Sequence, residues 1–117
     1  MSLDFDLCGY LNVGPVNSKK VRVELYSNNI THNLGKMAEA AGLYEPLWNA
    51  EENGYKKGAD VIPLLREGLA KLKDDPEKYK ALNAPNGWGT YKYFVPFVAN
   101  ILEACERYPR AIIEVSK

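Results

Sequence analysis

The sequence predicts a small α+β domain, and three observations predict it. Apolar and charged residues alternate near the N-terminus with the period of a half-buried strand, helical-period runs fill the middle of the chain, and a β-branched run closes it. This order, in which strands come first, helices follow and one strand ends the chain, is typical of a small sheet with helices on one face. Because 117 residues suit one hydrophobic core, we expect residues 1–117 to form a single domain.

Three strands are expected, at about 3–8, 21–26 and 111–116. The first two show the clearest alternation, and Gly14-Pro15 marks a turn between them, so they are expected to form a hairpin. The last strand must satisfy its backbone hydrogen bonds against a neighbour. We expect that neighbour to be 21–26, because these are the two most strand-like runs.

Three to four helices are expected, at about 32–41, 60–73, 76–82 and 91–107. Thr31 and Asp75 precede helical runs and have side chains that accept hydrogen bonds from exposed N–H groups of a first turn. The second helix begins at about Gly58 or Asp60. With Asp60 as the cap, Pro63 is tolerated near the start of the helix, whereas an earlier start would make Pro63 a kink.

Trp88 stands between Gly87 and Gly89, just before the last helix, and it has two interpretations. As an aromatic wall beside Asn86 and Tyr91, its ring would stack on a sugar, a base or a partner side chain. As a core plug, it would be buried as large aromatic side chains usually are, with Gly87 in a left-handed turn. We favour the core plug.

His32 is the only histidine, and it lies in the polar segment Asn28–Asn33 at a strand-to-helix junction. Exposed N–H groups and polar side chains converge at such junctions, and an imidazole can exchange a proton near neutral pH. The competing interpretation, which we favour, is that these residues cap the helix and solvate the turn. No serine or cysteine can be paired with His32 from spacing, so no catalytic residue is assigned.

Composition narrows the classes of partner. Fifteen basic residues balance fifteen acidic ones and alternate with them, which ranks nucleic-acid binding last. No metal-ligand spacing, phosphate-binding loop or dinucleotide fingerprint occurs, so no metal and no cofactor are expected. Cys8 and Cys105 are expected to be free thiols in a reducing cytoplasm. No run of about 18 apolar residues is present, so no membrane partner is expected.

We therefore expect a non-enzymatic binding or assembly module that acts on a protein partner or on its own copies. Eight tyrosines and Trp48 favour this function, because Tyr and Trp are enriched at interfaces. Four of the tyrosines need not all be buried: Tyr26, Tyr44, Tyr55 and Tyr79. For the tyrosines we favour the competing interpretation, which is packing at the edge of the core. The alternative is a small-ligand or enzyme site where the Asn28–Asn33 turn meets the Asn86–Tyr91 loop. Its candidate binding residues are Asn29, His32, Asn33, Asn86, Trp88 and Tyr91.

Four segments carry a resemblance to known proteins. They read N-I-T-H-N-L-G-K-M-A at Asn29–Ala38, N-G-W-G-T-Y at Asn86–Tyr91, E-A-C-E-R-Y-P at the end of the last helix, and A-I-I-E-V-S in the closing strand. Over residues 21–117 the chain resembles small uncharacterised proteins of phages, prophages and gut bacteria. The resemblance implies no activity, and it marks the Asn-Thr-His turn and the Gly-Trp-Gly loop as the distinctive parts of the fold.

Overall fold

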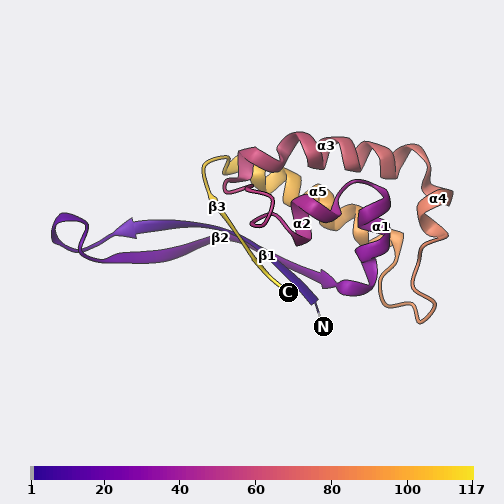
Figure 1. Ribbon diagram of the computed structural model, residues 1–117, viewed down its shortest axis with the longest axis horizontal. Coiled ribbons are helices and arrows are strands. Elements are labelled where there is room, and N and C mark those ends of the chain that lie inside the picture. The colour runs from indigo at the N-terminus through magenta and orange to yellow at the C-terminus, as the bar shows by residue number, and fades with distance from the viewer. Residues whose placement is uncertain (1) are drawn as a thin grey trace.

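The computed structural model describes residues 2–117 and has an antiparallel sheet of three strands with the helices on one side of it (Figure 1). The strands are β1 (Ser2–Asn12), β2 (Lys20–Thr31) and β3 (Ile112–Ser116), in the order β2-β1-β3. The helices are α1 (Gly35–Ala40), α2 (Tyr44–Trp48), α3 (Gly58–Asp74), α4 (Pro76–Lys80) and α5 (Tyr91–Arg107), with 3₁₀ turns at Pro15–Asn17 and His32–Leu34. The predicted α+β class is confirmed.

The predicted hairpin is confirmed, but the predicted partner of the last strand is wrong. β1 pairs with β2 from Ser2 opposite Thr31 to Asn12 opposite Lys20, with a bulge at Leu25 of β2, and β3 pairs with β1, from Asp4 opposite Ser116 to Cys8 opposite Ile112. β1 is central because its apolar residues Leu3, Phe5 and Leu7 are fully buried under the helices. β2 therefore forms one edge of the sheet.

The helices follow the sequence patterns with two differences. The run expected at 32–41 begins as a 3₁₀ turn, in which the Thr31 hydroxyl accepts a hydrogen bond from the N–H of Asn33, and only then becomes α1. α3 begins at Gly58, so Asp60 is its third residue and not its cap. The Asp60 carboxylate accepts the N–H groups of Lys57 and Lys56, at 2.9 and 3.0 Å, and these bonds lower its pKa.

The core lies between the sheet and the helices. α3 and α5 pack against each other over the sheet, and Trp48 of α2, which is 2% exposed, closes the core at one side. Trp48 is therefore a core residue and contributes no interface surface. Most of the tyrosines also pack on the core: Tyr79 is buried, and Tyr26, Tyr44 and Tyr55 are partly buried against it, whereas Tyr10 and Tyr93 are exposed.

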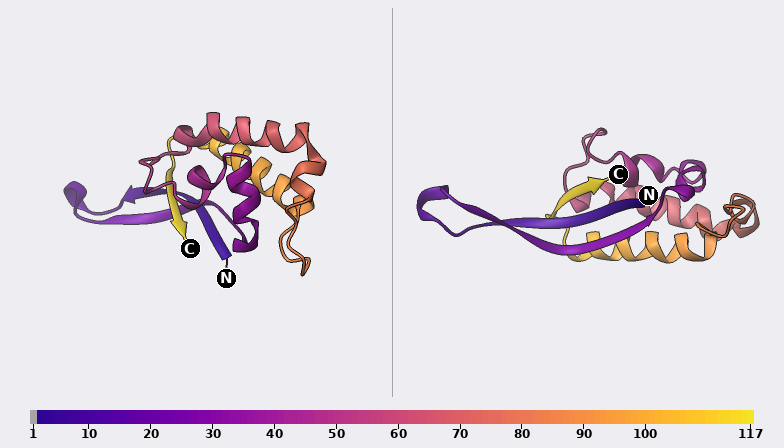
Figure 2. Two further views of the ribbon diagram at one scale, coloured as in Figure 1. Left: turned by 45° about the vertical axis from the view of Figure 1, so that its right-hand side comes forward. Right: turned by 90° about the horizontal axis from the view of Figure 1, so that it is seen from below.

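The sheet extends well beyond this body. The far end of the β1–β2 hairpin projects from the helices in every view, and the molecule measures 55 × 27 × 22 Å (Figures 1 and 2). Neither α3 nor α5, nor any other helix described between residues 2 and 117, is long and apolar enough to cross a bilayer.

Candidate functional site

The loop before α5 is docked on the turn that follows β2. The Nδ2 group of Asn33 donates to the carbonyl of Trp88 at 2.9 Å, and Gly89 is buried against the same turn. A Cβ at Gly89 would lie 3.0 Å from Cγ2 of Thr31, and its φ of +107° favours glycine. The two segments singled out in the sequence are therefore in direct contact.

Four of the six predicted site residues share one open hollow of about 520 Å³. They are Asn29, His32, Asn33 and Trp88. A second hollow, of about 700 Å³, is lined by His32, Asn33 and Asn86 together with Lys36 and the start of the 83–90 loop. Tyr91 lines neither hollow, since its hydroxyl donates to the carbonyl of Leu72 at 2.7 Å and ties α5 to α3.

Trp88 is not the core plug that we favoured. Its side chain is 72% exposed and lines one hollow with Tyr93, which is 62% exposed. The side-chain Oδ1 of Asn86 accepts the backbone N–H of Trp88 at 3.0 Å, and Gly87 has a φ of +77°, so this turn directs the indole away from the core. The turn itself was predicted, and the direction of the side chain was not.

His32 has a structural bond that the sequence did not reveal. Its Nδ1 accepts the indole N–H of Trp48 at 3.0 Å, and the Trp48 ring stacks on Tyr44 with centroids 5.4 Å apart. The bond satisfies the only polar atom of a buried tryptophan, which explains why a histidine stands at this position. Only Nε2 of His32 is left to meet a ligand.

These contacts limit what the hollow can do chemically. One side-chain polar atom of each of Asn33, His32 and Asn86 already has a structural partner. Within residues 2–117, no three His, Cys, Asp or Glu side chains are grouped so that they could hold a metal ion. The remaining polar atoms and the exposed indole of Trp88 are of the kind that binds a ligand.

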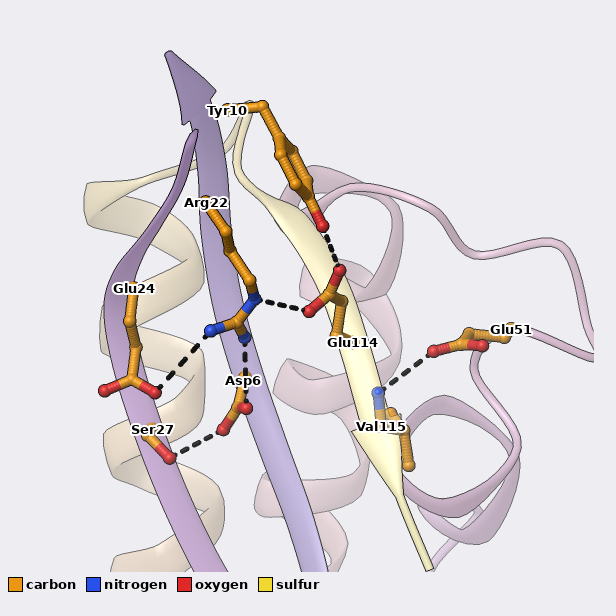
Figure 3. A network of polar contacts seen from close by, with 8 residues as sticks. All are labelled: Asp6, Tyr10, Arg22, Glu24, Ser27, Glu51, Glu114 and Val115. Atoms are coloured by element: carbon orange, nitrogen blue, oxygen red, sulfur yellow. Dashed lines mark hydrogen bonds and ion pairs between the residues drawn. The ribbon is translucent and has the colours of Figure 1, made fainter. Parts of the chain in front are cut away.

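A second polar feature covers the open face of the sheet, on the side away from the helices (Figure 3). Arg22 of β2 is its centre: Nε donates to Glu114 at 2.7 Å, and a terminal nitrogen donates to Asp6 at 3.2 Å. Tyr10 donates to the other oxygen of Glu114. These bonds lower the pKa of Glu114 and raise the pKa of Tyr10 to about 12.

The projecting end of the hairpin carries apolar side chains that no helix covers. We call residues 9–23 the arm. Its apolar side chains are between 40% and 94% exposed, with Val16 at the turn the most exposed; they are Tyr10, Leu11, Val13, Val16, Val21 and Val23. Exposed apolar residues gathered on one extended element are typical of a protein interaction surface.

Neither cysteine is available as a reactive group. Cys8 and Cys105 are free and have no exposed surface. Burial raises the pKa of both thiols, to about 12 for Cys105. They are inert packing residues.

No protein-family model matches the chain, and neither a curated protein nor a solved structure matches it. What the geometry defines is a small α+β body with a projecting hairpin arm at one end and an exposed aromatic loop at the other (Figure 1).

Proposed function

We propose that this chain is a non-enzymatic binding and assembly module and that the arm is its protein-interaction surface. One observation carries the proposal: the arm is a long two-stranded ribbon with exposed apolar side chains, and it projects from a body that has its own hydrophobic core. A two-stranded ribbon is marginally stable by itself. Another protein surface that packs on the arm would bury its exposed apolar side chains and stabilise it.

The rest of the molecule is consistent with this function. The polar groups of the candidate hollow serve to hold the loop, and the thiols are inert. We propose a cytoplasmic location, where free thiols persist. A phage or prophage origin remains the expectation from the resemblance.

Site-specific photo-cross-linking tests the proposal. A benzophenone amino acid replaces Val16 at the arm turn, and a matched control carries it at Lys73, an exposed residue of α3. In cells that produce the chain, irradiation should give a discrete cross-linked product from position 16 alone. No product at position 16, or the same products from both positions, would contradict the proposal.

The shared hollow supports a second candidate function, the binding of a small aromatic or sugar ligand. The supporting observation is that Trp88, His32 and Asn29 line one open hollow. An indole face and amide groups suit such a ligand. Fragment titration followed by the indole N–H signal of Trp88 tests it, with Trp88→Ala as the control. A ligand should shift the signals of Trp88 and His32 together, and a library that shifts neither would count against this function.

A further inference from the structure

β2 offers an open edge of the sheet. β1 has strands on both sides, and the outer edge of β3 is covered, because the N–H of Ile113 donates to the carbonyl of Lys56 and the N–H of Val115 donates to the carboxylate of Glu51 (Figure 3). In the described part of the chain, no comparable bond reaches the outer side of Lys20–Tyr26. Open edges of this length are templates for pairing with another strand.

The sequence of this edge is complementary to itself. In an antiparallel pair about a twofold axis through Val23, Arg22 of each copy lies opposite Glu24 of the other. Val23 then faces Val23 of the second copy, and Val21 lies toward Leu25, where β2 has its bulge. Moving the axis by one residue either way sets Arg22 against Arg22 or Glu24 against Glu24. Like charges directly opposite are unfavourable, so charge selects the register centred on Val23.

The charged groups are available for this pairing. Glu24 has a side chain that is 53% exposed, and its only contact within residues 2–117 is with its own Arg22 at 4.0 Å. The other two guanidinium nitrogens of Arg22 are held by Glu114 and Asp6, which fixes the guanidinium on the open face (Figure 3). Its remaining nitrogen, NH1, has only the 4.0 Å contact with Glu24 of its own chain, which is longer than a hydrogen bond.

Pairing of two β2 edges would also cover part of the arm. Val23 lies between the arm turn and the body, so antiparallel pairing runs the arm of each copy alongside the body of the other. This covers the exposed Val21, Val23 and Leu25 of both copies.

We propose that the occupant of the β2 edge is a second copy of this chain, joined through Val21–Leu25 about an axis at Val23 into one continuous six-stranded sheet. This inference rests on the proposed function, because it names the partner of the arm.

Two measurements on the full chain test the inference. Light-scattering mass, followed from about 1 µM to about 1 mM, should rise from that of the monomer toward twice that value. Glu24→Arg sets arginines opposite each other and should weaken the dimer at least about tenfold. Glu77→Arg is the matched control, since Glu77 is 87% exposed on α4 and distant from β2; it should leave the dimer unchanged.

A cysteine cross-link tests the register. Residues that face each other across an antiparallel pair have Cα atoms about 4.5–5.5 Å apart, within the range of a disulfide. Val23→Cys should oxidise rapidly to a covalent dimer, whereas Leu11→Cys, which is exposed on the other strand of the arm, should not. The buried native thiols give little background.

The outcomes separate this inference from the proposed function. A monomer at every concentration, with Val23→Cys no faster than Leu11→Cys, overturns self-pairing. A dimer that Glu24→Arg leaves intact and that Val23→Cys does not cross-link overturns it as well. The photo-cross-link at Val16 decides the proposed function by itself, because a product with a different polypeptide supports the arm as an interaction surface even if self-pairing fails.

Discussion

Removing the end of the arm should leave the fold intact. The register places Tyr10 directly opposite Arg22, so residues 11–21 can be replaced by an asparagine–glycine turn that joins the two strands there. The replacement keeps both residues and their bonds to Glu114. It removes the exposed apolar residues Leu11, Val13 and Val16.

The expected change in the free energy of unfolding is small. The apolar side chains that are removed, Leu11, Val13, Val16 and Val21, are 42% to 94% exposed and are outside the core cluster, so little burial is lost. Their ordering also costs about 1–2 kcal/mol of backbone entropy per residue, which offsets the pairing of the ribbon. We expect a net change within about 1 kcal/mol.

Urea unfolding followed by far-ultraviolet circular dichroism measures this change. Leu7→Ala, on the same strand but fully buried, is the matched control and should lose about 2–5 kcal/mol. If the shortened chain loses as much as the Leu7 variant, the arm supports the fold, and the reasoning that assigns it to interaction is refuted.

Three further results are expected. Gly89→Ala should lower the free energy of unfolding by about 1–3 kcal/mol, because its φ of +107° and its close neighbours oppose a side chain; an unchanged urea midpoint would contradict the docked loop. Cys8 and Cys105 should react with a thiol reagent at pH 8 only after unfolding, since burial raises the pKa of both; rapid labelling of the native chain would contradict their burial. The lowered pKa of Glu114 stabilises the fold above the ordinary carboxyl value of about 4.3, and this contribution is lost as the pH falls through the folded-state value. Glu114→Gln should therefore be less stable than the wild type at pH 7, by at most about 1 kcal/mol after solvent screening, and the difference should vanish at low pH; a difference that persists there would contradict the ion-pair assignment.

Local signals predicted most of the fold. The apolar stripe of α5 gave its bounds at Tyr91 and Arg107, and the alternation in β1 and β2 predicted their hairpin. The partner of β3 was missed, because strand order is decided by contacts distant in sequence, such as Ile113 opposite Leu7. No local pattern records such a contact.

The sequence predicted where the turn and the loop of the candidate site lie, but the expectation that Trp88 is buried was wrong. The marked turn and loop do meet, but glycines on both sides of Trp88 specify a turn without specifying which way the indole points. The bond between His32 and Trp48 joins residues from separate elements and has no sequence signature. The sequence also did not predict that the arm projects from the body. Alternation of apolar and polar residues predicts a half-buried strand whether or not a helix covers that strand.

Amide hydrogen exchange along Val21–Leu25 tests most directly whether the β2 edge receives another strand. The outward-facing N–H groups should exchange rapidly at about 1 µM and become protected at about 1 mM, where the dimer forms, while those of α3 and α5 stay unchanged. Equal exchange of these β2 amides at both concentrations would contradict the account.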